Sequence, residues 1–154
     1  MRPTKPTIRQ ASPDEAQLLT TLTLQSKAYW GYDAEFMATA VAELTITPEY
    51  IAQYAVFILQ AGDDILGYCS LVDHGDELLL DNLFIAPEYI GKGYGSLLWH
   101  HTVDQARLKG YQAILLDADP NAAPFYEKLG AVQFSEVPSN IQPGRTLPRM
   151  RFSL

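Results

Sequence analysis

The sequence predicts an α/β fold in which a mixed, mostly antiparallel sheet of about seven strands carries helices on both faces. Hairpin-type turns at 62–64 and 73–76 separate strand-like runs, which predicts an antiparallel meander. The run 77–85 is apolar on both faces, as expected for a strand covered on both sides. A helical run at 96–109 connects it to the strand-like run 113–116, and a helical connection requires these two strands to be parallel.

The chain begins with signals for one short strand and one helix. A strand is predicted at 7–10. Residues 12–15 read Ser-Pro-Asp-Glu, which combines a capping box with proline at the first helical position. The helix that starts there is predicted to run to about Tyr29, and Gly31 ends it.

Two further helix starts follow. Asp33 is predicted to cap a second helix with an apolar stripe of Phe36, Met37, Ala40, Val41 and Leu44. The tripeptide Thr-Pro-Glu at 47–49 repeats the capping pattern for a short third helix.

The remaining elements follow the hairpin turns. Strands are predicted at 55–59, 65–72 and 77–85, and Gly110 ends the helix after the third of them. Gly130 ends another short helix, and a segment rich in proline and glycine at 136–150 precedes a last strand.

The composition narrows the class of protein. A chain of 154 residues, 47% hydrophobic and 19% charged, is expected to form one globular domain over 1–154. The net charge of −7 argues against a nucleic-acid partner and agrees with a cationic or neutral substrate. No apolar run approaches the roughly 20 residues of a membrane helix, and the start at 1–6 lacks the apolar stretch of a signal peptide. We therefore expect a cytoplasmic protein without a membrane partner.

Metal binding is not expected either. Cys69 is the single cysteine, and the three histidines are scattered without a zinc-binding pattern. A homodimer is compatible with everything in the sequence.

A glycine-rich turn lies between the strand at 77–85 and the following helix. Residues 89–96 read Tyr-Ile-Gly-Lys-Gly-Tyr-Gly-Ser. Glycine permits positive φ and close ligand approach, so successive N–H groups there can converge on a phosphate at the start of the helix. Lys92 adds a mobile cation. The turn therefore predicts a pyrophosphate site, although a glycine-rich turn without a ligand remains the alternative.

Spacing separates the nucleotide-binding motifs. A Walker loop requires Ser or Thr where this chain has Gly93, and it requires an earlier glycine that is absent. A dinucleotide fingerprint requires a glycine where this chain has Ser96, on the first strand–helix turn. The pattern of Gly91, Gly93 and Gly95 after an apolar strand instead resembles the acyl-CoA loop of the GNAT N-acetyltransferases.

A second motif strengthens this resemblance. Residues 121–131 read Asn-Ala-Ala-Pro-Phe-Tyr-Glu-Lys-Leu-Gly-Ala, which is similar to the signature that closes the GNAT fold. Together with 81–95 it matches two motifs of the family in the right order and at the right separation. The order of elements resembles the family from about Thr7 to Leu154.

The resemblance implies a GNAT fold, with the sheet splayed after its fourth strand, and acetyl-CoA as cosubstrate. It implies that Asn121 hydrogen-bonds near the pantetheine and that Tyr126 protonates the leaving thiolate as general acid. The pantetheine would pair with the backbone of Leu83, Phe84 and Ile85. The pyrophosphate would be held by the loop of Gly91, Lys92, Gly93, Tyr94, Gly95 and Ser96. The family usually has Arg or Gln where this chain has Ile90, so one phosphate contact is missing here.

The sequence does not identify which group acts as the general base. Acyl transfer needs a neutral amine, so a proton must leave an ammonium group whose ordinary pKa is about 10. Asp81 is the candidate because it shares a strand face with Leu79 and Leu83, where apolar surroundings favour proton uptake. Asp81 could equally be a structural carboxylate, and Glu77 or a water chain could serve instead.

The sequence indicates the residues that would bind the amine acceptor less clearly than those that would bind the cosubstrate. The resemblance implies that the first two helices form a lip over the acceptor channel, which makes three aromatics candidate substrate-binding residues: Trp30, Tyr32 and Phe36. Packing of a helix corner would explain them equally well. The segment 136–150 could fold back over the acceptor, with Arg145 pairing with a carboxylate or phosphate, or it could be a surface loop. Asp119 is assigned to turn formation.

Two functions of different class follow. The first is an N-acetyltransferase that moves the acetyl group of acetyl-CoA to a small-molecule or peptide amine in a ternary complex. The second is a catalytically degenerate CoA-binding sensor or interaction module with the same fold. Retention of Tyr126 and Asp81 favours the enzyme.

Overall fold

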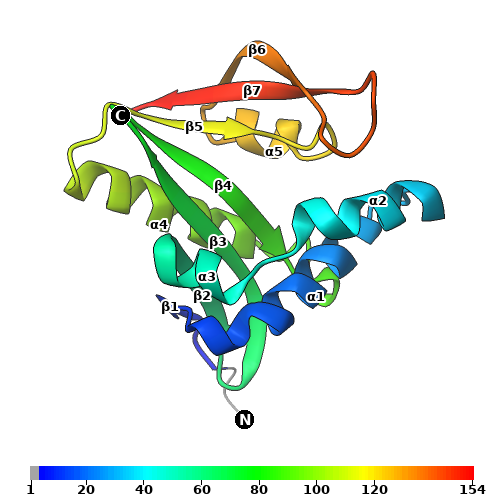
Figure 1. Ribbon diagram of the computed structural model, residues 1–154. Helices are drawn as coiled ribbons and strands as arrows, with labels where there is room; N and C mark the ends of the chain where they lie inside the picture. The colour runs from blue at the N-terminus through cyan, green and yellow to red at the C-terminus, as the bar shows by residue number, and fades with distance from the viewer. Residues whose placement is uncertain (1–3) are drawn as a thin grey trace.

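The computed structural model describes residues 4–154. The expectation that no signal peptide is present rests partly on residues 1–3, which lie outside the described residues. A seven-stranded sheet organises the chain in the order β1-β2-β3-β4-β5-β7-β6 (Figure 1). Its strands are β1 Thr7–Gln10, β2 Ala55–Ala61, β3 Asp64–His74, β4 Glu77–Ile85, β5 Ala113–Asp117, β6 Val132–Pro138 and β7 Thr146–Ser153. Among these pairs only β4 and β5 are parallel, which confirms the mixed, mostly antiparallel sheet that was predicted.

The helices are α1 Ala16–Ala28, α2 Ala34–Leu44, α3 Pro48–Gln53, α4 Tyr94–Leu108 and α5 Ala123–Lys128, with short 3-10 turns at Pro13–Glu15 and Pro87–Tyr89. Two of the helices, α2 and α3, begin where their capping residues predict, whereas α4 begins two residues before the predicted start at 96. The Asp33 carboxylate accepts the backbone N–H of Phe36 at 2.8 Å, and the Thr47 hydroxyl accepts that of Tyr50 at 3.0 Å. These contacts satisfy N–H groups that have no partner inside the helix.

The sheet has a hydrophobic cluster on each face. Along β2, Val56 and Ile58 pack toward α1 and α3, whereas Phe57 and Leu59 pack toward α4. The strand period of two produces this division, because successive side chains point to opposite faces. The prediction of helices on both faces is therefore confirmed.

The sheet opens between β4 and β5. Their parallel register joins only Glu77–Leu79 to Ala113–Leu115. Beyond Leu79, β4 continues to Ile85 in register with β3 but without β5 beside it. Figure 1 shows the two strands diverging from the corner near the C-terminus, with α1 and α2 on one arm and β5, β6 and β7 on the other. This opening positions the candidate site.

Two expectations about the fold need correction. The predicted apolar stripe of α2 is only partly buried, because α2 packs chiefly on α1; Ala40 is fully buried but Val41 is 47% exposed. The segment 136–150 is less irregular than its prolines suggested. Pro138 and Pro148 lie within β6 and β7, and only the loop 139–145 between these strands is irregular.

Candidate active site

A cavity of about 470 Å³ fills the opening between β4 and β5. One wall is the part of β4 from Leu80 to Ile85, and the opposite wall comes from Leu116 to Ala122 after β5. The edge of β4 that faces away from β3 has no strand partner there among the described residues. An extended ligand can therefore hydrogen-bond to it as an added strand would.

The glycine loop closes one end of this cavity. Gly91 and Gly93 have φ values of +84° and +85°, which side chains rarely tolerate, and Gly93 is the residue at which α4 begins. Gly95 has a different role, because a Cβ there would lie 3.1 Å from the Phe125 ring. Of the expected loop residues, Lys92 does not line the cavity, and its ammonium lies 5.9 Å from the centre of the Tyr89 ring.

The loop leaves the first N–H groups of α4 without intrahelical partners beside the cavity. A helix start of this kind attracts anions through those N–H groups and the helix dipole. The arrangement suits a pyrophosphate.

Tyr126 lies in α5 with its side chain buried beneath the cavity. Its ring packs edge-on against Trp99 and Phe125, with centroids 5.8 and 5.0 Å apart. The hydroxyl makes no hydrogen bond to any residue within 4–154, and the residue lines the cavity. Burial raises the pKa of Tyr126 well above its ordinary value, so the phenol stays protonated at neutral pH.

Asp81 lines the same cavity from β4, but its side chain is exposed. The apolar surroundings that were expected for it are therefore not found. Its carboxylate accepts the Tyr50 hydroxyl, and that hydroxyl also lies 2.8 Å from the Ser70 hydroxyl. Asn82 donates to Ser70 at 2.9 Å and completes this group.

Glu77, the alternative base, lies elsewhere. It does not line the cavity, and the Arg151 guanidinium donates to its two carboxylate oxygens at 2.6 and 3.4 Å. Asp81 is the carboxylate on β4 that faces the cavity.

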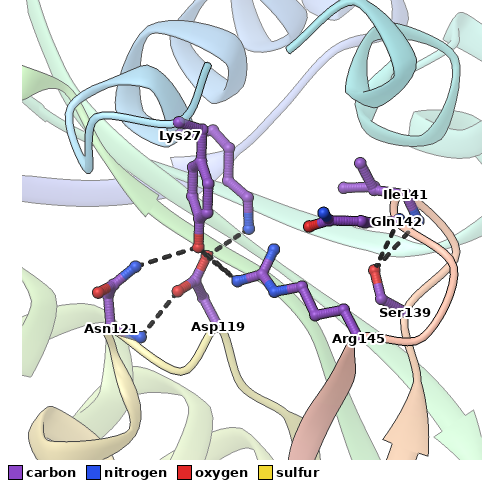
Figure 2. A network of polar contacts seen from close by, with 8 residues as sticks. Lys27, Asp119, Asn121, Ser139, Ile141, Gln142 and Arg145 are labelled. Atoms are coloured by element: carbon purple, nitrogen blue, oxygen red, sulfur yellow. Dashed lines mark hydrogen bonds and ion pairs between the residues drawn. The ribbon is translucent and has the colours of Figure 1, made fainter. Parts of the chain in front are cut away.

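A polar cluster of Lys27, Tyr32, Asp119, Asn121 and Arg145 joins the two arms across the acceptor side (Figure 2). The Asp119 carboxylate receives the Lys27 ammonium, the Tyr32 hydroxyl at 2.7 Å and the backbone N–H of Asn121 at 2.8 Å. Asn121 also donates its side-chain amide to the Tyr32 hydroxyl at 3.0 Å. Asp119 thus holds a turn, as expected, but it also bridges α1 to the turn after β5.

The charges of this cluster shift the titration of its members. Burial alone would raise the pKa of Asp119, but the hydrogen bond and charge of Lys27 together with the Tyr32 hydroxyl lower it below its ordinary value. Burial and the hydrogen bond to Asp119 raise the pKa of Tyr32, against the opposing effect of Arg145. Asp119 is therefore the anion of the cluster at neutral pH.

The three aromatic candidates for acceptor binding do not line one site. Trp30 lines the cavity and is 43% exposed. Tyr32 and Phe36 do not line it; they stack on each other with centroids 4.1 Å apart. The ammonium of Lys27 and the guanidinium of Arg145 lie against this stack, between 4.8 and 5.9 Å from the ring centres.

The loop 139–145 folds back onto α2 and the polar cluster, while the prediction that it covers an acceptor stays a prediction. Asn140 donates to Glu43 of α2 at 3.1 Å, and Arg145 reaches the Tyr32 hydroxyl at 2.5 Å. Nothing in the sequence around Lys27 indicates that it belongs to this cluster, because its partner Asp119 is 92 residues away.

Within residues 4–154 the structure has no cluster of three or more side chains suited to a metal ion, and no helix there is long and apolar enough to cross a membrane.

Comparison with known proteins identifies relatives of this chain. Residues 22–131 match the sequence model of the acetyltransferase (GNAT) family. A [ribosomal protein bS18]-alanine N-acetyltransferase of Haemophilus influenzae is 36% identical over 87 residues. That match covers 55% of this chain and 58% of the relative, so the chain spans less than two thirds of the relative's length.

Solved structures support the fold over the whole chain. A GCN5-related N-acetyltransferase from Rhodopseudomonas palustris has a TM-score of 0.82 at 22% identity, covering 100% of this chain and 99% of its own. The PaiA N-acetyltransferase of Thermoplasma acidophilum, solved in complex with coenzyme A, has a TM-score of 0.81 at 18% identity, covering 97% and 99%. At these identities the similarity concerns the fold.

Proposed function

The chain belongs to the acetyltransferase (GNAT) family, and on this premise we propose that it transfers the acetyl group of acetyl-CoA to a primary amine. The observation that carries the proposal is the cavity between β4 and β5. It brings a free strand edge, a helix start with glycine φ values above +80° and a protonated phenol to one space.

In the proposed complex, acetyl-CoA lies in the cavity with its pyrophosphate at the glycine loop and its thioester at the other end. Its pyrophosphate suits the N–H groups of 91–96, and its pantetheine suits the free edge of β4 at Leu83, Phe84 and Ile85. Asn121 also lines the cavity, and because one amide N–H bonds to Tyr32, its second N–H and its carbonyl oxygen are left for a contact with the pantetheine. The thioester would then lie near Tyr126.

The chemistry needs one bond formed, one broken and two proton transfers. The neutral amine nitrogen attacks the thioester carbonyl carbon, and a β4 backbone N–H stabilises the oxyanion that develops. The carbon–sulfur bond breaks as the amide forms. Tyr126 donates its proton to the departing CoA thiolate, and the proton lost from nitrogen passes to Asp81, directly or through water.

Direct attack agrees with the burial of the one cysteine, the side chain best suited to carry an acetyl group. Cys69 is the single cysteine of the sequence, and its side chain is fully buried in the core beneath α4. Burial raises the pKa of this thiol to about 12, so it carries no thiolate at neutral pH.

A CoA-binding sensor with the same fold is the competing function. It would need the glycine loop and the β4 edge but not Tyr126 or Asp81. The hydroxyl of Tyr126 favours the enzyme, because the residue lines the cavity and this hydroxyl bonds to no other residue among 4–154, so it is free to act on a ligand there.

The test is release of CoA thiol. The purified protein is mixed with acetyl-CoA and a panel of primary amines, and free thiol is followed with a chromogenic disulfide. Release that depends on the amine, with an equal amount of N-acetylated product by mass spectrometry, supports the enzyme. Binding of CoA in calorimetry without such release supports the sensor.

A further inference from the structure

The polar cluster beside the cavity holds more positive than negative charge. Lys27 and Arg145 supply two cations, and Asp119 supplies one carboxylate. The side chains of Lys27 and Arg145 are only 8% and 17% exposed. In a chain of net charge −7, this sheltered excess of positive charge is a local exception.

Asp119 does not satisfy Arg145. Its oxygens already receive Lys27, the Tyr32 hydroxyl and the Asn121 N–H, and the closest Arg145 nitrogen is 3.9 Å away. The guanidinium has five N–H donors, and within the described chain one hydrogen bond uses them, to the Tyr32 hydroxyl at 2.5 Å.

The guanidinium is nevertheless held in one orientation. Tyr32 and Phe36 stack beneath it at 4.8 and 5.0 Å from their ring centres. The Ser139 hydroxyl accepts the N–H groups of Ile141 and Gln142, which folds the loop that leads to Arg145. Figure 2 shows the Arg145 side chain extending from the loop toward Asp119. A cation that is sheltered, oriented and short of acceptors is arranged to receive an anion.

The cluster also borders the cavity that holds the reaction. Lys27, Asp119 and Asn121 line the same cavity as Asp81 and Tyr126. Arg145 does not line the cavity itself, but its guanidinium bonds to the Tyr32 hydroxyl, which in turn contacts the lining residues Asp119 and Asn121. An anion at Arg145 would therefore lie beside the cavity, and the amine of the same molecule could enter it.

We propose that the acceptor is a small amine that also carries a carboxylate, and that Arg145 binds this carboxylate. The inference rests on the proposed function and narrows its substrate class. Arginine suits the role because its planar fork matches the two oxygens of a carboxylate. Lys27 adds attraction through its charge while it remains paired with Asp119.

The experiment compares amines that differ only in the carboxylate. Phenylalanine is paired with 2-phenylethylamine, tryptophan with tryptamine, and 4-aminobutyrate with propylamine. For each pair, kcat/KM is measured at saturating acetyl-CoA with the wild-type protein, Arg145→Gln and Arg145→Lys. The ratio within a pair is compared between proteins, so that differences in amine basicity cancel.

Arg151→Gln is the matched control. Arg151 lies on the strand that follows Arg145, but it is paired with Glu77 and lies over the Phe134 ring, outside the polar cluster. Thermal unfolding of every variant with bound CoA shows whether the fold is retained.

We expect the wild type to prefer the carboxylate-bearing member of at least one pair. Arg145→Gln should lower that ratio about 10- to 100-fold, as expected for loss of a hydrogen-bonded charge partner. Arg145→Lys should retain part of the ratio, and Arg151→Gln all of it. A purely structural Arg145 would lower both members of a pair alike.

Three results would overturn the inference. One is a wild type that uses the carboxylate-free amines as well or better throughout. Another is an Arg145→Gln variant that leaves the ratio unchanged. The third is the absence of turnover with every amine, which would remove the proposed function and this inference together and is recognised by the lack of any thiol release.

Discussion

Replacement of Tyr126 by phenylalanine removes the proposed acid and little else. The ring would keep its packing against Trp99 and Phe125. The hydroxyl that disappears has no hydrogen-bond partner among residues 4–154, so its loss leaves no other group unsatisfied. We therefore expect a change in the free energy of unfolding of no more than about 0.5 kcal/mol.

The effect on catalysis should be far larger. A general acid contributes about 10²- to 10⁴-fold, so kcat should fall at least about 100-fold, which corresponds to about 2.7 kcal/mol of barrier. The dissociation constant of CoA should stay within about twofold, because the proposed phosphate site lies at the other end of the cavity. Because burial raises the pKa of Tyr126 far above neutrality, the wild type should not lose kcat through this group as pH rises to about 9.

Thiol release measures kcat, calorimetry measures CoA affinity, and chemical denaturation measures stability. Tyr111→Phe is the control, since the Tyr111 hydroxyl bonds to Asp73 and does not line the cavity. An unchanged kcat in a folded Tyr126→Phe protein would refute the acid role and make this tyrosine part of the core.

Four further substitutions test other parts of the site. Gly93→Val should abolish CoA binding in calorimetry, because a β-branched residue cannot adopt a φ of +85° at the start of α4 without strain. An undiminished affinity for CoA in folded Gly93→Val protein would refute the phosphate site. Asp81→Asn should remove most of the activity in thiol release, whereas activity that persists in the folded variant would assign the base to a water chain. Trp30→Ala should raise the KM of the acceptor more than that of acetyl-CoA, because Trp30 lines the cavity from the turn after α1, and equal changes in both KM values would assign it a packing role. Asp119→Asn should destabilise the protein by about 3 kcal/mol, because it leaves the buried Lys27 cation unpaired. Because folding lowers the pKa of Asp119, the ion pair stabilises the wild type above the ordinary carboxyl pKa, and this stability is lost as pH falls. The urea midpoints of the wild type and Asp119→Asn should therefore converge in acid. A difference between the two midpoints that stays constant with pH would contradict the pairing.

The sequence predicted the fold well where local signals agree. The bounds of β4 follow from an apolar run between two turns, and the start of α2 follows from Asp33, whose carboxylate caps the helix as expected. The parallel pairing of β4 with β5 follows from the helix that connects them. Each of these depends on residues close together in the chain or on a topological rule.

The acceptor side was harder to predict because it depends on contacts between distant residues. Lys27 and Asp119 meet across 92 positions, and Tyr32 and Arg145 across 113. The spacing of aromatics near Trp30 could not show that Tyr32 and Phe36 would turn toward each other and away from the cavity. Which side chains share a cavity depends on the angle between the two arms, and no local pattern encodes that angle.

An initial-rate study with both substrates varied separates direct attack from an acetyl-enzyme. Direct attack in a ternary complex requires acetyl-CoA and amine to be bound together, so double-reciprocal plots against one substrate at several fixed concentrations of the other should intersect. We also expect no burst of CoA thiol from acetyl-CoA alone, since the single cysteine is buried with its pKa raised to about 12. Parallel lines, a stoichiometric burst without amine, or no amine-dependent turnover in protein that binds CoA would contradict direct transfer from acetyl-CoA to the amine.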